Sequence, residues 1–130
     1  GDKSDDPVSM YVPEFSEVKV FVDGKMESPR REITIRDLLT HTSGIAYGFS
    51  APDELKPYFE NAFADINLLE DAAKKIATLP LAAEPGSLFI YGLNIDVLGR
   101  VIEVVSEQEF EVYLQEYIFT PLVQNDSQGA

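Results

Sequence analysis

Ser16 and Lys19 have the Ser-x-x-Lys spacing in which a lysine amine can help to remove the proton of a serine hydroxyl. That chemistry requires both side chains on one face of a helix, three residues apart. Here they border an alternating segment, residues 17–22, which predicts a strand. An odd separation along a strand points two side chains to opposite faces, so we reject this pair as a nucleophile and its base.

His41 and Ser43 suggest a serine–histidine dyad, but closeness at the end of a predicted helix does not supply nucleophile-to-base geometry, and no third partner is identifiable. We interpret residues 41–44 as a helix-ending turn. His41 is the only histidine and cysteine is absent, which excludes disulfides, a thiol nucleophile and an imidazole or thiolate metal cluster. We therefore expect neither a metal nor a cofactor.

Tyr91 stands where a helix is expected to begin. A Pro-Gly pair at residues 85–86 ends the preceding segment, and after Gly92 the apolar residues fall at helical spacing. With apolar neighbours on its N-terminal side, such a tyrosine usually packs in a core with its hydroxyl bonded to the backbone. On the residues alone, packing is the simpler interpretation of Tyr91, and also of a second group, Met10, Tyr11 and Phe15.

The first part of the chain predicts short helical turns followed by a hairpin. One or two helical turns are expected between Asp5 and Pro13, because an aspartate can cap a helix that a proline then ends. Residues 17–22 are expected to form a strand. The Asp23-Gly24 pair is a strong signal for a tight turn, with a short partner strand after it.

The rest of the chain predicts helices. Thr34 and Asp37 have the spacing of a capping box, which indicates a helix over residues 35–41, and Gly44 is a natural stop. The other expected helices are a loose one at 53–63, a better one at 66–79, one after Tyr91 with an apolar stripe from Val97 to Val105, and a last one carrying Phe110, Leu114 and Ile118 that stops before Pro121. The predicted fold class is therefore mainly α with a small β-hairpin.

Length and charge narrow the classes of partner. A chain of 130 residues with 45% hydrophobic residues can build the core of one domain. A net charge of −13, spread over the whole length, repels phosphate backbones, so nucleic acid is not an expected partner. No apolar run approaches the roughly 20 residues that a membrane helix needs.

Four ordered segments carry a family resemblance: DDPVSMYVPEF, ITIRDLLTHTSGI, EPGSLFIYGLNIDVLGRVIEVVS and FEVYLQEYIFTPL. They are similar to successive segments of the serine β-lactamase and penicillin-binding-protein-like superfamily, in the branch of class C β-lactamases, serine esterases and D-alanyl peptidases. The resemblance implies three catalytic elements, namely a Ser-x-x-Lys on a helix, a Tyr-x-Asn-like motif and a Lys-Thr-Gly-like strand. Tyr91 matches the tyrosine, which implies that it transfers protons in the intact protein.

A free phenol, with a pKa near 10, is a poor base at neutral pH and needs a nearby ammonium. In the family this ammonium belongs to the lysine of the first element, which the resemblance places before Gly1. No Lys-Thr-Gly-like triplet follows Tyr91. We therefore expect residues 1–130 to be the helical lobe of a larger α/β serine hydrolase, cut out between the nucleophile and the last strands and inactive by itself.

One departure from the family pattern bears on the substrate. Where the family often has an asparagine that can bind a substrate amide, this chain has Leu93, with Asn94 one step later. Both are candidate substrate contacts, and leucine cannot make the amide hydrogen bond, so an esterase-like activity is favoured. The alternative is a non-catalytic binding or scaffold domain derived from the same family.

The resemblance also implies partners. The helical lobe is expected to pack on the α/β lobe of the intact protein, which would act on a small acyl substrate. By itself the lobe would expose apolar surface near Phe89, Ile90 and Tyr91, which favours a homodimer.

Overall fold

The computed structural model describes residues 3–113. The chain opens with three short 3-10 helices, η1 (Lys3–Asp5), η2 (Val8–Met10) and η3 (Pro13–Glu17). Pro7 precedes η2 and Pro13 begins η3. Since a proline lacks the N–H that would continue an α-helix, two of them six residues apart keep these turns short. The helical turns expected from the sequence are thus present, in 3-10 form.

The hairpin is smaller than predicted. Strand β1 (Val20–Val22) pairs antiparallel with β2 (Lys25–Glu27), with Val20 opposite Glu27. Asp23 and Gly24 both have positive φ, 49° and 79°, as a two-residue hairpin turn requires. The predicted strand over 17–22 began too early, because Glu17 still belongs to η3.

The capping box on α1 (Ile35–Leu39) is confirmed. The Thr34 hydroxyl accepts from the backbone N–H of Asp37 at 3.3 Å, and the Asp37 carboxylate accepts from the N–H of Thr34 at 2.9 Å. The helix ends before His41, which has a φ of 56°, so the predicted end at residue 41 was slightly late. A left-handed residue cannot continue an α-helix.

The other helices keep their predicted places with different ends. The loose helix is η4 (Asp53–Leu55) followed by α2 (Lys56–Phe59), which ends early because Glu60 is extended. Helix α3 (Leu69–Thr78) starts three residues after the predicted Ile66, because Leu68 is extended. The greatest difference is α4 (Asn94–Tyr113), one continuous helix where two were predicted; Leu114 and Ile118 lie outside the described residues.

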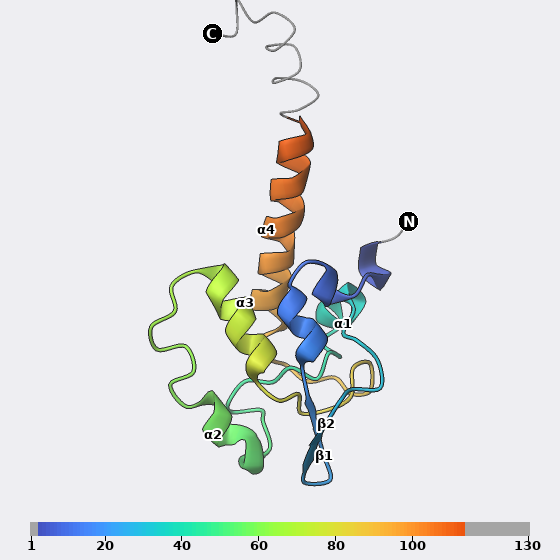
Figure 1. Ribbon diagram of the computed structural model, residues 1–130. Coiled ribbons are helices and arrows are strands. Elements are labelled where there is room, and N and C mark those ends of the chain that lie inside the picture. The colour runs from blue at the N-terminus through green and yellow to red at the C-terminus, as the bar shows by residue number, and fades with distance from the viewer. Residues whose placement is uncertain (1–2, 114–130) are drawn as a thin grey trace, which may run out of the picture.

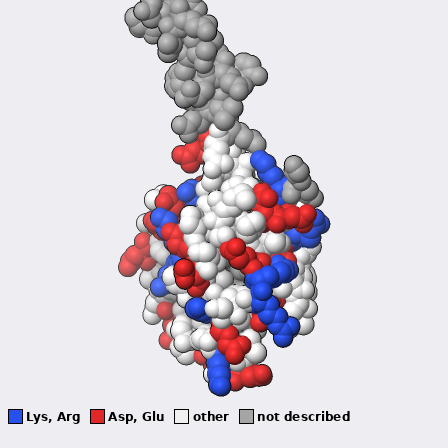
Figure 2. Space-filling view, turned by 45° about the vertical axis from the view of Figure 1, so that its right-hand side comes forward, with Lys and Arg blue, Asp and Glu red and all other residues white. Residues whose placement is uncertain are grey.

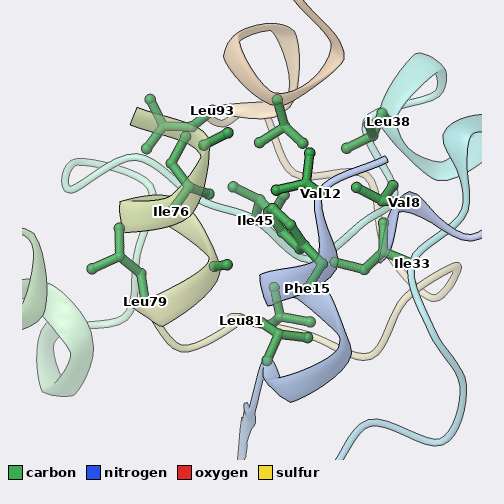
Figure 3. Close-up of a cluster of buried hydrophobic side chains, with 14 of the residues drawn as sticks. Val8, Val12, Phe15, Ile33, Leu38, Ile45, Ile76, Leu79, Leu81 and Leu93 are labelled. Atoms are coloured by element: carbon green, nitrogen blue, oxygen red, sulfur yellow. The ribbon is translucent and has the colours of Figure 1, made fainter. Parts of the chain in front are cut away.

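One apolar core holds these short elements around the first half of α4. Figure 1 shows α3, α1 and the N-terminal turns gathered at the base of α4, whose second half continues beyond them. Val97 and Val101 of α4 are buried there. The side chains in Figure 3 come from widely separated segments, including Val8, Phe15, Ile45, Ile76, Leu81 and Leu93. The prediction of a mainly α fold with a hairpin is confirmed.

Asp37 is the main buried carboxylate, 4% exposed. Its two oxygens receive the Arg31 guanidinium at 2.7 and 2.9 Å. Burial pushes the pKa of Asp37 up, but the hydrogen bonds from Arg31 and from the backbone of Thr34 outweigh burial and hold it below its ordinary value. Arg31 also packs over Gly86, where a Cβ would overlap the guanidinium, so this pair ties α1 to the loop that leads to Tyr91.

We predict that Asp37→Asn destabilises the fold by about 1–3 kcal/mol at neutral pH, because a charged hydrogen-bonded pair loses one partner. Since the pKa of Asp37 is lower in the folded state, its contribution is complete above the unfolded-state pKa of about 4 and is lost as pH falls through the folded-state pKa. Urea unfolding across this pH range should show that the difference in the free energy of unfolding between wild type and variant becomes smaller as the pH falls. Exposed Asp65→Asn is the control, and an unchanged difference would contradict the prediction.

Candidate active site around Tyr91

The backbone of Tyr91 is held from several sides. The N–H of Ile90 donates to the carbonyl of His41 at 2.8 Å, and the Ser50 hydroxyl donates to the carbonyl of Tyr91 at 3.0 Å. Gly92 lies so close to residues 45–46 that a Cβ there would overlap the Ile45 carbonyl. Tyr91 therefore sits on a fixed backbone, three residues before α4 begins.

The Tyr91 side chain faces outward, with 53% of its surface exposed. Its ring is stacked on the His41 imidazole, with centroids 5.4 Å apart and planes 25° apart, and lies 5.7 Å from the Tyr47 ring. Phe89 touches His41 and Phe49 touches Tyr47, and both are largely exposed. The packing interpretation of Tyr91 predicted a core position. The structure instead presents the phenol on the surface, at the centre of an aromatic cluster.

A buried polar chain supports this cluster from beneath. The Ser43 hydroxyl donates to Oδ1 of Asn94, and Nδ2 of Asn94 faces Nδ1 of His41 at 3.2 Å and the Ile90 carbonyl at 3.5 Å. The backbone N–H of Ile45 donates to the Ser43 oxygen at 3.1 Å. Ser43 and Asn94 are both 0% exposed. This hydrogen-bond network was not predicted from the sequence, because Ser43 and Asn94 lie 51 residues apart in the sequence. The only signal in the sequence was an asparagine at the start of an apolar helix.

The neighbouring phenol, Tyr47, is affected by both burial and negative charge. Burial raises the pKa of Tyr47, and the negative charge of Asp96 and the nearby Tyr91 raise it further. Both effects disfavour the ionised form of Tyr47.

Neither serine pair from the sequence has the geometry of a nucleophile and its base. Ser16 belongs to η3, which ends at Glu17, whereas Lys19 follows it and donates to the Ser28 hydroxyl at 3.2 Å. The rejection of Ser16 and Lys19 stands, but its reason changes. The two residues do not share a strand; they are unsuitable because no helix carries both of them. Ser43 is buried and donates to Asn94, not to His41, as expected of residues in a helix-ending turn.

Leu93 and Asn94, the candidate substrate contacts, have other partners in this structure. Leu93 is 8% exposed and packs in the core (Figure 3), and the Asn94 amide is taken up by Ser43, His41 and Ile90. Their contact with a substrate stays a prediction. The geometry itself gives them a role in fixing the start of α4.

Other surfaces offer less chemistry. A hollow of about 410 Å³ lies away from Tyr91, lined by Glu14, Glu17, Lys19, Met26, Tyr58, Ala77, Thr78 and Pro80. In the described part of the chain, no group of histidine and carboxylate side chains could hold a metal, and no helix is long and apolar enough to cross a membrane. Figure 2 shows acidic and basic side chains interspersed over one face, without a block of one sign.

A family model described as Beta-lactamase matches residues 2–128. The chain belongs to this family. It is 33% identical to the acyltransferase mokF of Monascus pilosus over 91% of its length, and 36% identical over 102 residues to lovastatin esterase of Penicillium rubens, covering 78% of this chain and 25% of that protein. It also matches the structure of EstCE1, a hydrolase with promiscuous acyltransferase activity, at 38% identity and a TM-score of 0.63, over 87% of this chain and 30% of the other. The chain spans about 30% of the length of its curated relatives.

Gly92→Ala tests whether the backbone contact with residues 45–46 holds the Tyr91 loop. We expect a loss of about 1–3 kcal/mol in urea unfolding, because the added methyl group overlaps backbone atoms that cannot swing away. The NMR signals of the Tyr91 ring should shift as well. Gly48→Ala is the matched control, since its Cβ would make only an ordinary contact with Phe59. Equal stability of the two variants would show that the contact is not tight.

Proposed function

We propose that the protein containing this chain is a serine acyl hydrolase of the β-lactamase family, working through an acyl-enzyme and favouring esters. The observation that carries the proposal is the exposed phenol of Tyr91 on a backbone fixed by Ser50, His41 and the residue 45–46 turn. A group that transfers protons has to reach the substrate and still be held in place. The family membership and the names of two relatives, an esterase and an acyltransferase, support the same chemistry.

In the proposed reaction, a serine from the Ser-x-x-Lys element attacks the acyl carbon and its proton passes through lysine and Tyr91 to the leaving alkoxide. The serine–acyl bond forms as the ester C–O bond breaks. Water, or another alcohol, then attacks the acyl carbon and the serine–acyl bond breaks, while Tyr91 takes the proton of the attacking hydroxyl and passes it to the serine oxygen. The serine and lysine come from the part of the protein that the resemblance places before Gly1.

The preference for esters rests on what this turn does not offer. Leu93 faces the core and the Asn94 amide is already hydrogen-bonded, so neither presents a polar group to a substrate amide. An amide group of a substrate bound here would lose its water without gaining a partner, and this loss disfavours amide substrates relative to esters.

The α/β lobe is the proposed partner of this surface. Phe49, Leu88 and Phe89 are between 59% and 75% exposed. Phe49 contacts Tyr47 and Phe89 contacts His41, the two rings that lie against Tyr91. Apolar side chains gathered around a candidate site are typical of a face that another part of a protein covers. When this chain is alone, the same face would favour a homodimer.

Replacing Tyr91 by Phe in the intact hydrolase removes the phenolic oxygen and keeps the ring. We expect kcat to fall about 100-fold or more, the usual scale for a positioned proton-transfer group. Tyr58→Phe, which removes a hydroxyl from the distant hollow, should leave kcat unchanged. Full activity of Tyr91→Phe would return Tyr91 to a structural role, whereas an intact protein without any hydrolase activity would favour the non-catalytic scaffold.

The 130-residue chain by itself is a second control for the same proposal. With neither nucleophile nor lysine partner, it should give no hydrolysis above buffer and no adduct with a fluorophosphonate or with penicillin, read by mass spectrometry. An adduct at Ser16 or Ser43 would show that rejecting these serines was wrong.

Substrate class is tested by comparing kcat/KM for p-nitrophenyl acetate and a chromogenic cephalosporin on the intact hydrolase. We expect the ester to react faster, because the turn at residues 93–94 has no free amide-binding group. Faster turnover of the cephalosporin would refute the ester preference and leave the acyl-enzyme mechanism standing.

A further inference from the structure

We propose that His41 is a positioning residue for Tyr91: the buried Asn94 amide holds its imidazole as the Nε2–H tautomer, and this fixed ring is the platform on which the phenol lies. The proposal rests on the proposed function only where it concerns catalysis. The arrangement itself is carried by the hydrogen bonds beneath the aromatic cluster.

The first step is the orientation of the Asn94 side chain. An amide can be turned so that its oxygen and nitrogen exchange places, and its surroundings decide which way it lies. Here the Ile90 carbonyl, which can only accept, lies 3.5 Å from Nδ2. The reversed amide would put two oxygens against each other, whereas the observed one gives Oδ1 to the Ser43 hydroxyl. The Asn94 NH2 group therefore faces His41.

The second step follows from the 3.2 Å between Nδ2 of Asn94 and Nδ1 of His41. A donor on the asparagine requires a lone pair on Nδ1, and a neutral imidazole with a free Nδ1 carries its proton on Nε2. A proton on Nδ1 would set two donors against each other and leave a buried amide N–H unpaired. The buried chain therefore selects one tautomer.

The third step concerns the backbone beneath the ring. His41 has a left-handed φ of 56°, its N–H donates to the Leu38 carbonyl at 3.4 Å, and its carbonyl receives the Ile90 N–H at 2.8 Å. Main chain and ring are thus both anchored. Tyr91 stacks on this ring at 5.4 Å, so the place of the phenol depends on the imidazole beneath it.

The tautomer is directly measurable, because His41 is the only histidine. Long-range ¹H–¹⁵N NMR on the 130-residue chain at about pH 8, where a free imidazole is neutral, gives separate signals for the two ring nitrogens. We expect the Nε2–H form in wild type. The Nδ1–H form in wild type would overturn the proposal, because it would mean that the amide lies the other way.

Asn94→Asp is the sharpest variant, since it keeps the shape of the side chain and replaces the donor that faces His41 by an acceptor. We expect the ring to carry a proton on Nδ1 in this variant. Asn67→Asp, at an exposed site, adds the same charge and should leave the tautomer unchanged. An unchanged tautomer in a folded Asn94→Asp variant would overturn the proposal; if that variant does not fold, the wild-type tautomer decides.

The platform is tested by His41→Asn, because asparagine tolerates a left-handed backbone and has no aromatic ring. The Tyr91 ring signals should shift in this variant, whereas in Phe89→Leu, which removes a ring that touches His41, they should move less. In the intact hydrolase we expect His41→Asn to lower kcat about 10-fold with KM unchanged, as for a misplaced catalytic group. Unshifted Tyr91 signals or an unchanged kcat would count against positioning. Full activity of Tyr91→Phe would instead refute the proton-transfer role that the proposed function gives to Tyr91.

Discussion

The buried side-chain amide of Asn94 is the constraint on which the arrangement around Tyr91 depends. An amide enclosed away from water has to find partners, because each buried polar group left unpaired costs about 1–3 kcal/mol. Asn94 finds them in Ser43, His41 and the Ile90 carbonyl. Satisfying one side chain thus joins the turn after α1 to the first residue of α4, with Tyr91 in the loop that approaches that residue.

The apolar core and the hydrogen bonds of Asn94 fix different aspects of the position of α4. Burial of Val97 and Val101 is non-directional, so it brings the helix against α1 and α3 without fixing its rotation or its first turn. The hydrogen bonds of Asn94 are directional and have one satisfied arrangement. The tight contact of Gly92 with residues 45–46 then sets the distance between the two segments.

The sequence predicted those features whose cause is local. The capping box of Thr34 and Asp37 and the turn at Asp23-Gly24 are confirmed, since their hydrogen bonds or backbone angles involve residues a few positions apart. The tyrosine could be singled out only through a family resemblance, and its role stays a prediction. The exposure of Tyr91 and its contact with His41 depend on segments about fifty residues apart, which no local pattern encodes. The single helix α4 was missed because the polar residues 106–109 resemble a helix end in the sequence, while the described backbone continues through them.

The described residues fix where the Tyr91 ring lies, and the proposed proton transfer needs a nearby cation as well. Burial, and then the negative charge of Asp96, raise the pKa of Tyr47, whose ring lies 5.7 Å from that of Tyr91. A tyrosine that exchanges protons at neutral pH needs an ammonium close by. Nearby carboxylates and aromatic faces offset the free energy that a positive group loses when it is partly desolvated. Under the proposed function, Asp96 and the exposed rings would favour a cation at this surface, and the lysine of the family's Ser-x-x-Lys element would be that cation.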